Sequence, residues 1–300
     1  MHDVLTLVAA PGDMLYPETI EDVTDALAAM GAHLGTIDVL AAGSAIDIGF
    51  AGPTPAAVDS TVRTVLAGRP IDLLAQPTAG RRKAMLIADM DSTIITVECI
   101  DELADYLGIK AEIAAITERA MRGELDFPAA LRERVARLAG LSLDMLDTCF
   151  RERIRLTPGA RALVRTMRAN GALTALVSGG FTYFTARVAT MAGFDVNRAN
   201  VLGHNGQALD GTVAEPILGA DAKAATLGEL ARARGLDPGD VLAVGDGAND
   251  IPMLKLAGLG VAYRAKPATA AAAGARVDHG DLSTLLFFQG YRRAQFHEHR

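Results

Sequence analysis

Four short apolar segments in the second part of the chain each end in glycine and polar residues. They are "KAMLIADMD" at 83–91, "GALTALVSGG" at 171–180, "DVLAVGDGAND" at 240–250 and "GLGVAYRAKP" at 258–267. Segments with helical spacing of apolar residues, 158–171 and 221–235, precede the second and the third. Apolar strands that alternate with helices predict an α/β fold with a Rossmann-like parallel sheet, covered on both faces. Such a sheet binds its ligands at the carboxyl ends of its strands.

About 60 residues of helical pattern, roughly 100–155, separate the first two of these strands. Phe127, Leu131, Val135 and Leu138 form one apolar stripe there. We expect an inserted helical cap over the ligand-binding edge of the sheet. The pair Asn205-Gly206 is a hairpin signal and predicts a small β excursion near 194–216.

The first 80 residues predict a separate unit. Strand patterns at 3–9, 43–52 and 71–76 and helical patterns at 20–30 and after Pro55 mark five elements of this unit, for which we expect the order strand, helix, two strands, helix, strand. This order is typical of a compact ferredoxin-like α+β unit. The stretch "PTAGRRKAM" at 77–85 reads as a linker whose three cations are solvated. The predicted domains are therefore 1–80 and 84–290.

Composition excludes several classes of function. A formal net charge of −7 disfavours a nucleic-acid binder or a binder of anionic membranes, both of which need a basic face. The two cysteines cannot form a disulfide framework or a zinc cluster of paired Cys-x-x-Cys motifs. No apolar run approaches the ~18–20 residues of a membrane span. We expect a soluble cytoplasmic protein.

The strand ends gather a set of groups suited to phosphate chemistry. Carboxylates from two strands form a hard oxygen site of the kind that Mg²⁺ prefers, while a serine hydroxyl, glycine amides and a lysine suit phosphate oxygens. One acid can attack phosphorus, and the acid two residues later can move a proton. Each motif alone has an ordinary interpretation as a turn or a solvated helix lysine; their order and their position at strand ends carry the prediction. The residues are Asp89, Asp91, Ser178, Gly179, Gly180, Lys223, Asp246, Asn249 and Asp250.

These four motifs, "DMDST", "SGG", Lys223 and "GDGAND", resemble those of the haloacid dehalogenase superfamily of phosphohydrolases over roughly residues 84–290. Within it, "VECIDELADYLG", "ITERAMRGELDFPAALRERVARLAGL" and "GANDIPML" are similar to the phosphoserine phosphatases. Met90 stands where phenylalanine is commoner in the family.

The resemblance implies a role for each motif residue. Asp89 would be the nucleophile and Asp91 the general acid/base. Mg²⁺ would be held by Asp89, Asp246 and the Asp91 carbonyl, with Asp250 in support. Ser178, Gly179 and Lys223 would bind phosphate. The amino-acid part of the substrate would be surrounded by Glu98, Met121, Phe127 and Arg134, with Asn249 nearby.

The chemistry of O-phosphoserine fits this set, because its carboxylate can pair bidentately with Arg134 and its ammonium with Glu98. Without the resemblance, Arg134 reads as part of a charged helix face and Glu98 as a surface acid. We expect hydrolysis of O-phospho-L-serine, the last step of serine biosynthesis. The alternatives are a phosphatase or phosphotransferase for another small phosphomonoester, or a silent amino-acid-binding regulator.

The N-terminal unit resembles an ACT domain, on its element order and on "APGD" at the first strand–helix turn. The resemblance implies a regulatory or dimerisation domain, with serine as a candidate effector. We therefore expect a homodimer.

Overall fold

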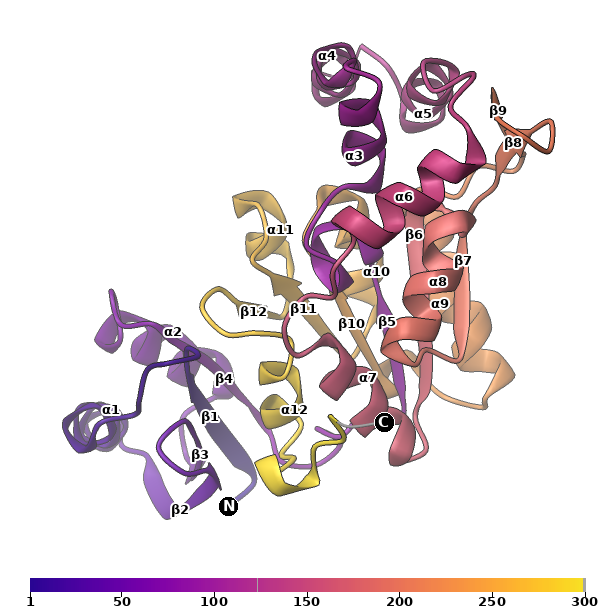
Figure 1. Ribbon diagram of the computed structural model, residues 1–300. Helices are drawn as coiled ribbons and strands as arrows, with labels where there is room; N and C mark the ends of the chain where they lie inside the picture. The colour runs from indigo at the N-terminus through magenta and orange to yellow at the C-terminus, as the bar shows by residue number, and fades with distance from the viewer. Residues whose placement is uncertain (123, 299–300) are drawn as a thin grey trace.

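The computed structural model describes residues 1–122 and 124–298, which form two larger sheets with their covering helices, a two-stranded hairpin and a helical cap (Figure 1). The elements before the cap are β1 (Asp3–Ala9), α1 (Pro17–Ala29), β2 (His33–Ala41), β3 (Ala45–Ala51), α2 (Pro55–Val65), β4 (Ile71–Pro77) and β5 (Met85–Ala88). The cap helices are α3 (Cys99–Tyr106), α4 (Lys110–Met121), α5 (Phe127–Ala136) and α6 (Leu143–Arg153). The remaining elements are α7 (Ala160–Ala169), β6 (Leu173–Phe181), α8 (Thr182–Ala192), β7 (Val196–Asn200), β8 (Leu202–His204), β9 (Leu209–Val213), α9 (Ala220–Ala233), β10 (Val241–Gly245), α10 (Ile251–Leu256), β11 (Leu259–Tyr263), α11 (Pro267–Ala272), β12 (Ala275–Val277) and α12 (Thr284–Phe288).

The larger sheet is parallel, with strand order β12-β11-β10-β5-β6-β7. Both of its faces are buried, as the apolar strands predict. Met85 and Ile87 of β5 pack with α9 and α10, while Leu86 and Ala88 pack with α7, α8 and α12. The Rossmann-like fold class is thereby confirmed. The carboxyl ends of β5, β6 and β10 face the cap (Figure 1).

The smaller sheet is antiparallel, with strand order β2-β3-β1-β4. Helices α1 and α2 cover one face through apolar residues such as Val23, Leu27, Val58 and Val62. Thr54 caps α2 by accepting the Ala57 N–H. Pro55 is well suited to the first position of the helix, where a backbone N–H would have no partner within the helix. The predicted ferredoxin-like unit is thus observed.

The second face of this small sheet is not solvated. Val8, Leu40 and Leu74 belong to the same apolar core as α12, which lies between the two sheets. The Asp72 carboxylate accepts backbone N–H groups of residues 278–280, and the Gln76 side chain donates to the Phe288 carbonyl. The two units therefore share buried contacts.

The cations of the connecting stretch are engaged, contrary to the expectation of a solvated linker. Arg81 pairs with Asp47 on β3 at 2.6 Å. Arg82 lies over the Tyr291 ring, with 4.3 Å between guanidinium carbon and ring centroid. Lys83 donates to the Gly80 and Gly239 carbonyls. The sequence pattern was ambiguous because a cation run reveals nothing of acids and carbonyls distant in sequence.

The cap consists of four helices between β5 and β6. Asp126 caps α5 and Ser142 caps α6, each through a backbone N–H three residues on, which fixes where these helices begin. Leu131, Val135 and Leu138 of the predicted stripe are buried. Phe127, at the first position of α5, is only half-buried and faces the cavity described below.

The predicted β excursion separates into two parts. Residues 202–213 form the β8–β9 hairpin around Asn205-Gly206, whereas β7 joins the large sheet as an edge strand. β12 forms the opposite edge and was not predicted, because three residues carry too little periodicity. Over the described ranges, no helix has the length and apolar character to cross a membrane.

Candidate active site

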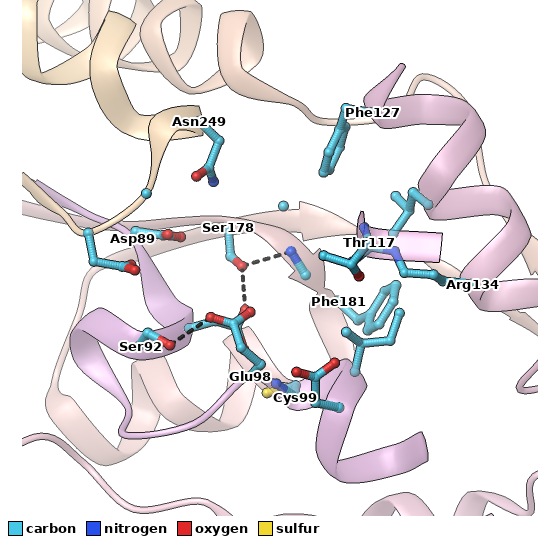
Figure 2. Close-up of a pocket in the computed structure, with 18 of the residues that line it drawn as sticks. Asp89, Ser92, Glu98, Cys99, Thr117, Phe127, Arg134, Ser178, Phe181 and Asn249 are labelled. Atoms are coloured by element: carbon cyan, nitrogen blue, oxygen red, sulfur yellow. Dashed lines mark hydrogen bonds between the residues drawn. The ribbon is translucent and has the colours of Figure 1, made fainter. Parts of the chain in front are cut away.

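A cavity of about 400 Å³ lies between the ends of the parallel strands and the cap. Its sheet side is formed by residues that directly follow β5 and β10, such as Asp89 and Asp246, and by Ser178 near the end of β6. Its cap side carries Thr117, Phe127 and Arg134 (Figure 2). The volume is in the range of small-molecule sites. The cavity therefore has a strand-end face and a cap face made of different kinds of side chains.

Lys223 lies at the floor of the strand-end face, fully buried between two acids. Its Nζ is 2.7 Å from Oδ1 of Asp89 and 2.7 Å from Oδ1 of Asp250. Oδ1 of Asp89 also accepts the Met90 N–H at 2.8 Å. The Asp250 carboxylate accepts the Gly247 N–H and occupies the space where a Cβ at Gly245 would lie, which explains the glycine there. Ion pairs and hydrogen bonds therefore join Lys223, Asp89 and Asp250 in one network.

Burial shapes the protonation of this network. Burial alone would lower the pKa of Lys223, but the carboxylates of Asp89 and Asp250 outweigh it and raise this pKa, so the lysine stays charged. Burial raises the pKa of Asp89 above its ordinary value, with Lys223 opposing and Asp250 and Asp91 adding to the rise. The site thus holds more negative charge than one lysine neutralises.

Asp91 is hydrogen-bonded to α3 of the cap and to β6. Its Oδ1 accepts the Cys99 N–H at 2.9 Å and its Oδ2 accepts the Ser178 hydroxyl at 3.1 Å. Burial raises the pKa of Asp91, and these hydrogen bonds oppose the rise. A Cβ at Gly180 would lie 2.8 Å from Oδ2 of Asp91, so the second glycine of "SGG" makes room for this carboxylate. A buried acid with a raised pKa is suited to giving and taking a proton.

Asp246 completes an oxygen cluster. One carboxylate oxygen from each of Asp89, Asp246 and Asp250 lies within 4.8 Å of the others, which is close enough for one hard divalent cation to contact all three. Oδ1 of Asp246 accepts the Thr93 hydroxyl at 3.0 Å. Burial and the nearby Asp250 raise the pKa of Asp246. The donor set therefore fits Mg²⁺, whose charge would offset this repulsion.

Glu98 lies beside Asp91, at the point where α3 begins. Ser92 donates to its Oε1 at 2.6 Å, as Figure 2 shows. Ser92 itself has a left-handed backbone (φ 54°), which is unusual for a residue other than glycine. Burial, together with the Asp91 charge, raises the pKa of Glu98 to about 7.

Arg134 and Phe127 reach the cavity from α5. Within the described ranges, Arg134 makes one side-chain hydrogen bond, to the Ala130 carbonyl at 3.3 Å, and no ion pair within 4.0 Å. The Phe127 ring lies so close to Gly179 and Gly219 that a Cβ at either glycine would be 3.2 Å from it. The ring therefore joins the cap to the strand-end loops, and Arg134 keeps donors available on the cavity side.

The structure brings the predicted residues together around one cavity. Asp89, Asp91, Glu98, Phe127, Arg134, Ser178, Gly179, Asp246 and Asn249 line it, and Lys223 and Asp250 lie beneath it. The side chain of Met121 lies outside the described part of the structure. The sequence patterns assigned no role in the site to Ser92, Thr93, Asp101, Thr117, Phe181, Gly247 and Lys266, and they placed Leu131 only in the apolar stripe of the cap. Ser92, Thr93 and Gly247 carried a signal, since they belong to the motifs "DMDST" and "GDGAND".

The profile of the haloacid dehalogenase-like hydrolases matches residues 86–255. The chain belongs to this family. It is 45% identical over 207 residues to a phosphoserine phosphatase of Polaromonas sp., covering 67% of this chain and 88% of the relative. It is 36% identical to a phosphoserine phosphatase of Streptomyces coelicolor over 97% of this chain and 72% of that protein. This family membership agrees with the resemblance that the acids at the strand ends suggested.

A solved structure resembles nearly the whole chain. The probable phosphoserine phosphatase from Vibrio cholerae, in its unliganded form, has a TM-score of 0.80 and 32% identity to this hydrolase. The match covers 98% of this chain and 88% of that one. The N-terminal sheet is therefore part of the shared fold.

Proposed function

We propose that this hydrolase is a Mg²⁺-dependent phosphoserine phosphatase, which hydrolyses O-phospho-L-serine to L-serine and phosphate in serine biosynthesis. One observation carries the proposal. The same cavity offers a buried phosphate-type end at Asp89 and Ser178, with Lys223 bonded to Asp89 beneath it, and an amino-acid-type end at Glu98 and Arg134. The similarity to phosphoserine phosphatases over most of the chain supports the substrate.

The oxygen cluster suits the metal. Mg²⁺ would be held by Asp89, Asp246 and the main-chain carbonyl of Asp91, with Asp250 supporting them. When bound, the ion would neutralise charge on the carboxylates and on the transferring phosphoryl group. Thr93 keeps Asp246 in place through its hydroxyl, and Lys223 bridges Asp89 and Asp250 as their common cation.

Asp89 is the nucleophile in the proposed reaction. Its Oδ1 is occupied by Lys223 and the Met90 N–H, so Oδ2 is the atom available to attack phosphorus. The new Asp89–phosphorus bond forms as the bond from phosphorus to the serine oxygen breaks, and Asp91 gives that oxygen its proton. A water molecule then attacks the aspartyl-phosphate, passes a proton to Asp91 and releases inorganic phosphate. Asp91 thus acts first as acid and then as base.

Ser178 and Gly179 would bind the phosphate together with Lys223. The Ser178 oxygen accepts the Gly180 N–H at 2.8 Å while its proton is directed to Asp91. A phosphate oxygen arriving beside Ser178 would compete for this proton, which would leave Asp91 free to hold its own. Phe127, packed on Gly179, would exclude water from the reacting groups.

Glu98 and Arg134 would bind the amino-acid part of the substrate. Arg134 has the planar donor set that binds a carboxylate bidentately, and Glu98 offers an acid to the ammonium. Asn249 and Met121 complete this part of the proposal. A phosphomonoester without these groups would lose both interactions.

For residues 1–80 we propose an ACT-like regulatory or dimerisation role, with the protein acting as a homodimer and serine as a candidate effector. The ferredoxin-like strand order β2-β3-β1-β4 supports this role. We also propose a cytoplasmic location, which two buried free thiols, Cys99 and Cys149, support.

Phosphate release from a panel of phosphomonoesters, with Mg²⁺ and with chelator, tests the proposed function. We expect O-phosphoserine to be the best substrate and chelator to abolish its turnover. Equal turnover of the whole panel would contradict the substrate, and full activity in chelator would contradict the metal. No turnover of any member would favour the silent regulator.

A further inference from the structure

Asp101 lies at the amino-acid end of the cavity and has no role in the mechanism above. It belongs to the first turn of α3, three residues after Glu98, and its half-buried side chain lines the cavity. Asp105, one helical turn later, is exposed and pairs with Arg153 away from the cavity. The two aspartates of one short helix thus face different surroundings.

The charges of the cavity divide between its two ends. Its lining contains five acids, of which Asp89, Asp91 and Asp246 belong to the phosphate end. Glu98 and Asp101 are the lining acids that remain for the amino-acid end. A ligand group that this pair would recognise is a cation.

Asp101 acts on Arg134 without being bonded to it. Burial lowers the pKa of Arg134, and the Asp101 charge opposes this more strongly than the Glu98 charge does. Within the described ranges, no ion pair within 4.0 Å joins Asp101 to any cation. The carboxylate is therefore close to the amino-acid end yet available to a ligand.

Glu98 alone offers an ammonium group a single carboxylate, one of whose two oxygens is already engaged. One of its oxygens already accepts the Ser92 hydroxyl at 2.6 Å. An ammonium carries three N–H donors, and burying them without acceptors is costly. A second carboxylate on the same wall would supply the missing acceptor.

We propose that Asp101 is a specificity-determining residue whose carboxylate, together with Glu98, binds the ammonium group of the substrate and leaves Arg134 to the carboxylate. This inference rests on the proposed hydrolysis of phosphoserine. It predicts that the enzyme distinguishes an amine-bearing phosphomonoester from its deaminated counterpart through two acids.

Three substrates test the inference with Asp101→Asn. They are phosphoserine, phosphoethanolamine, which lacks only the carboxylate, and 3-phosphooxypropionate, which lacks only the ammonium. We expect the variant to raise KM about 10-fold for the two amine-bearing substrates, as for a lost charge-assisted hydrogen bond. KM for 3-phosphooxypropionate and kcat for all three should stay within about twofold of wild type, since one group that binds the amine does not touch phosphorus.

Two matched variants complete the experiment. Asp105→Asn makes the same chemical change on the outer side of α3 and should leave all three KM values unchanged. Asp101→Glu keeps the charge and should recover most of the affinity for phosphoserine. It also provides a second measurement if Asp101→Asn does not fold.

The substrate pattern separates the possible failures. A rise in KM confined to the two carboxylate-bearing substrates would mean that Asp101 only orients Arg134, and it would overturn the proposal. An equal rise for all three, or none, would overturn it as well. A wild-type enzyme that does not prefer phosphoserine to its two truncated counterparts would instead contradict the proposed function.

Discussion

The two ends of the cavity are built differently. At the phosphate end, Lys223 and Asp250 are completely buried, and Lys223 bonds two carboxylates at 2.7 Å each. At the amino-acid end, Arg134 is half-buried and, among the residues that the structure describes, has one side-chain hydrogen bond, to its own helix. The first end is built on the strand ends and on the adjoining helices α9 and α10, and the second on the cap.

This difference suggests a division of labour. Groups that react with phosphorus need fixed positions, which a cross-bonded and buried network provides. Groups that choose the rest of the substrate can sit on an inserted cap, where a change of side chain leaves the sheet network intact. Changes at the phosphate end should therefore abolish turnover or destabilise the fold, whereas changes at the amino-acid end should redirect specificity.

The largest effect is expected from Asp89→Asn, which keeps the size of the side chain and removes the nucleophile. Turnover of phosphoserine should fall about 10,000-fold or more, because groups that act as a unit fail together. Steady-state kinetics with and without Mg²⁺ measure it. Activity within tenfold of wild type would break the assignment of the phosphate end.

Lys223→Met should affect stability as well as turnover. It leaves Asp89 and Asp250 buried without their cation, a loss of about 3–5 kcal/mol in the free energy of unfolding. Buried acids without a partner have a higher pKa in the folded than in the unfolded protein. Their charged form therefore destabilises the fold at a pH well above the unfolded pKa near 4, and this destabilisation shrinks as the pH is lowered toward 4. Thermal unfolding should therefore show a larger deficit at pH 8 than at pH 5. Lys255→Met, at an exposed position of α10, is the control and should change little.

Arg134→Ala tests the amino-acid end. KM for phosphoserine should rise roughly 30- to 150-fold, which corresponds to the loss of a charge-assisted bidentate pair worth ~2–3 kcal/mol of binding free energy. KM for phosphoethanolamine, which has no carboxylate, should change little. Arg137→Ala, at an exposed position near the end of α5, is the matched control. Equal losses on both substrates would make Arg134 a structural residue and remove the contrast between the two ends.

The smallest effect concerns pH. Since the pKa of Glu98 is raised to about 7, the acid loses its charge as pH falls through neutrality, and its attraction for an ammonium weakens. Relative to 3-phosphooxypropionate, kcat/KM for phosphoserine should fall about 10-fold between pH 8 and pH 6, one pKa unit below the midpoint. The ratio cancels the titration of the phosphate itself. A flat ratio would show that Glu98 does not bind the amine.

The phosphate end was predictable because its residues end strands. Asp89, Ser178 and Asp246 follow apolar segments, and parallel strands bring such ends to one edge. Asp101 and Thr117 were not predictable, because a single polar residue on a cap helix has no local signal that separates a cavity wall from solvent. The engagement of Arg81 with Asp47 was missed for the same reason: the partner is distant in sequence. Long-range side-chain contacts decide such cases, and periodicity does not contain them.

An acid-quench labelling experiment tests most directly the central claim that Asp89 is the nucleophile. The enzyme is mixed with Mg²⁺ and phosphoserine labelled in the phosphate, quenched within one turnover, digested, and the labelled peptide is sequenced. The account predicts that the label is on Asp89, in the peptide that contains "DMDST", and that Asp89→Asn carries none. Label on a serine such as Ser92 or Ser178, or a wild type that releases phosphate without ever carrying label, would contradict it.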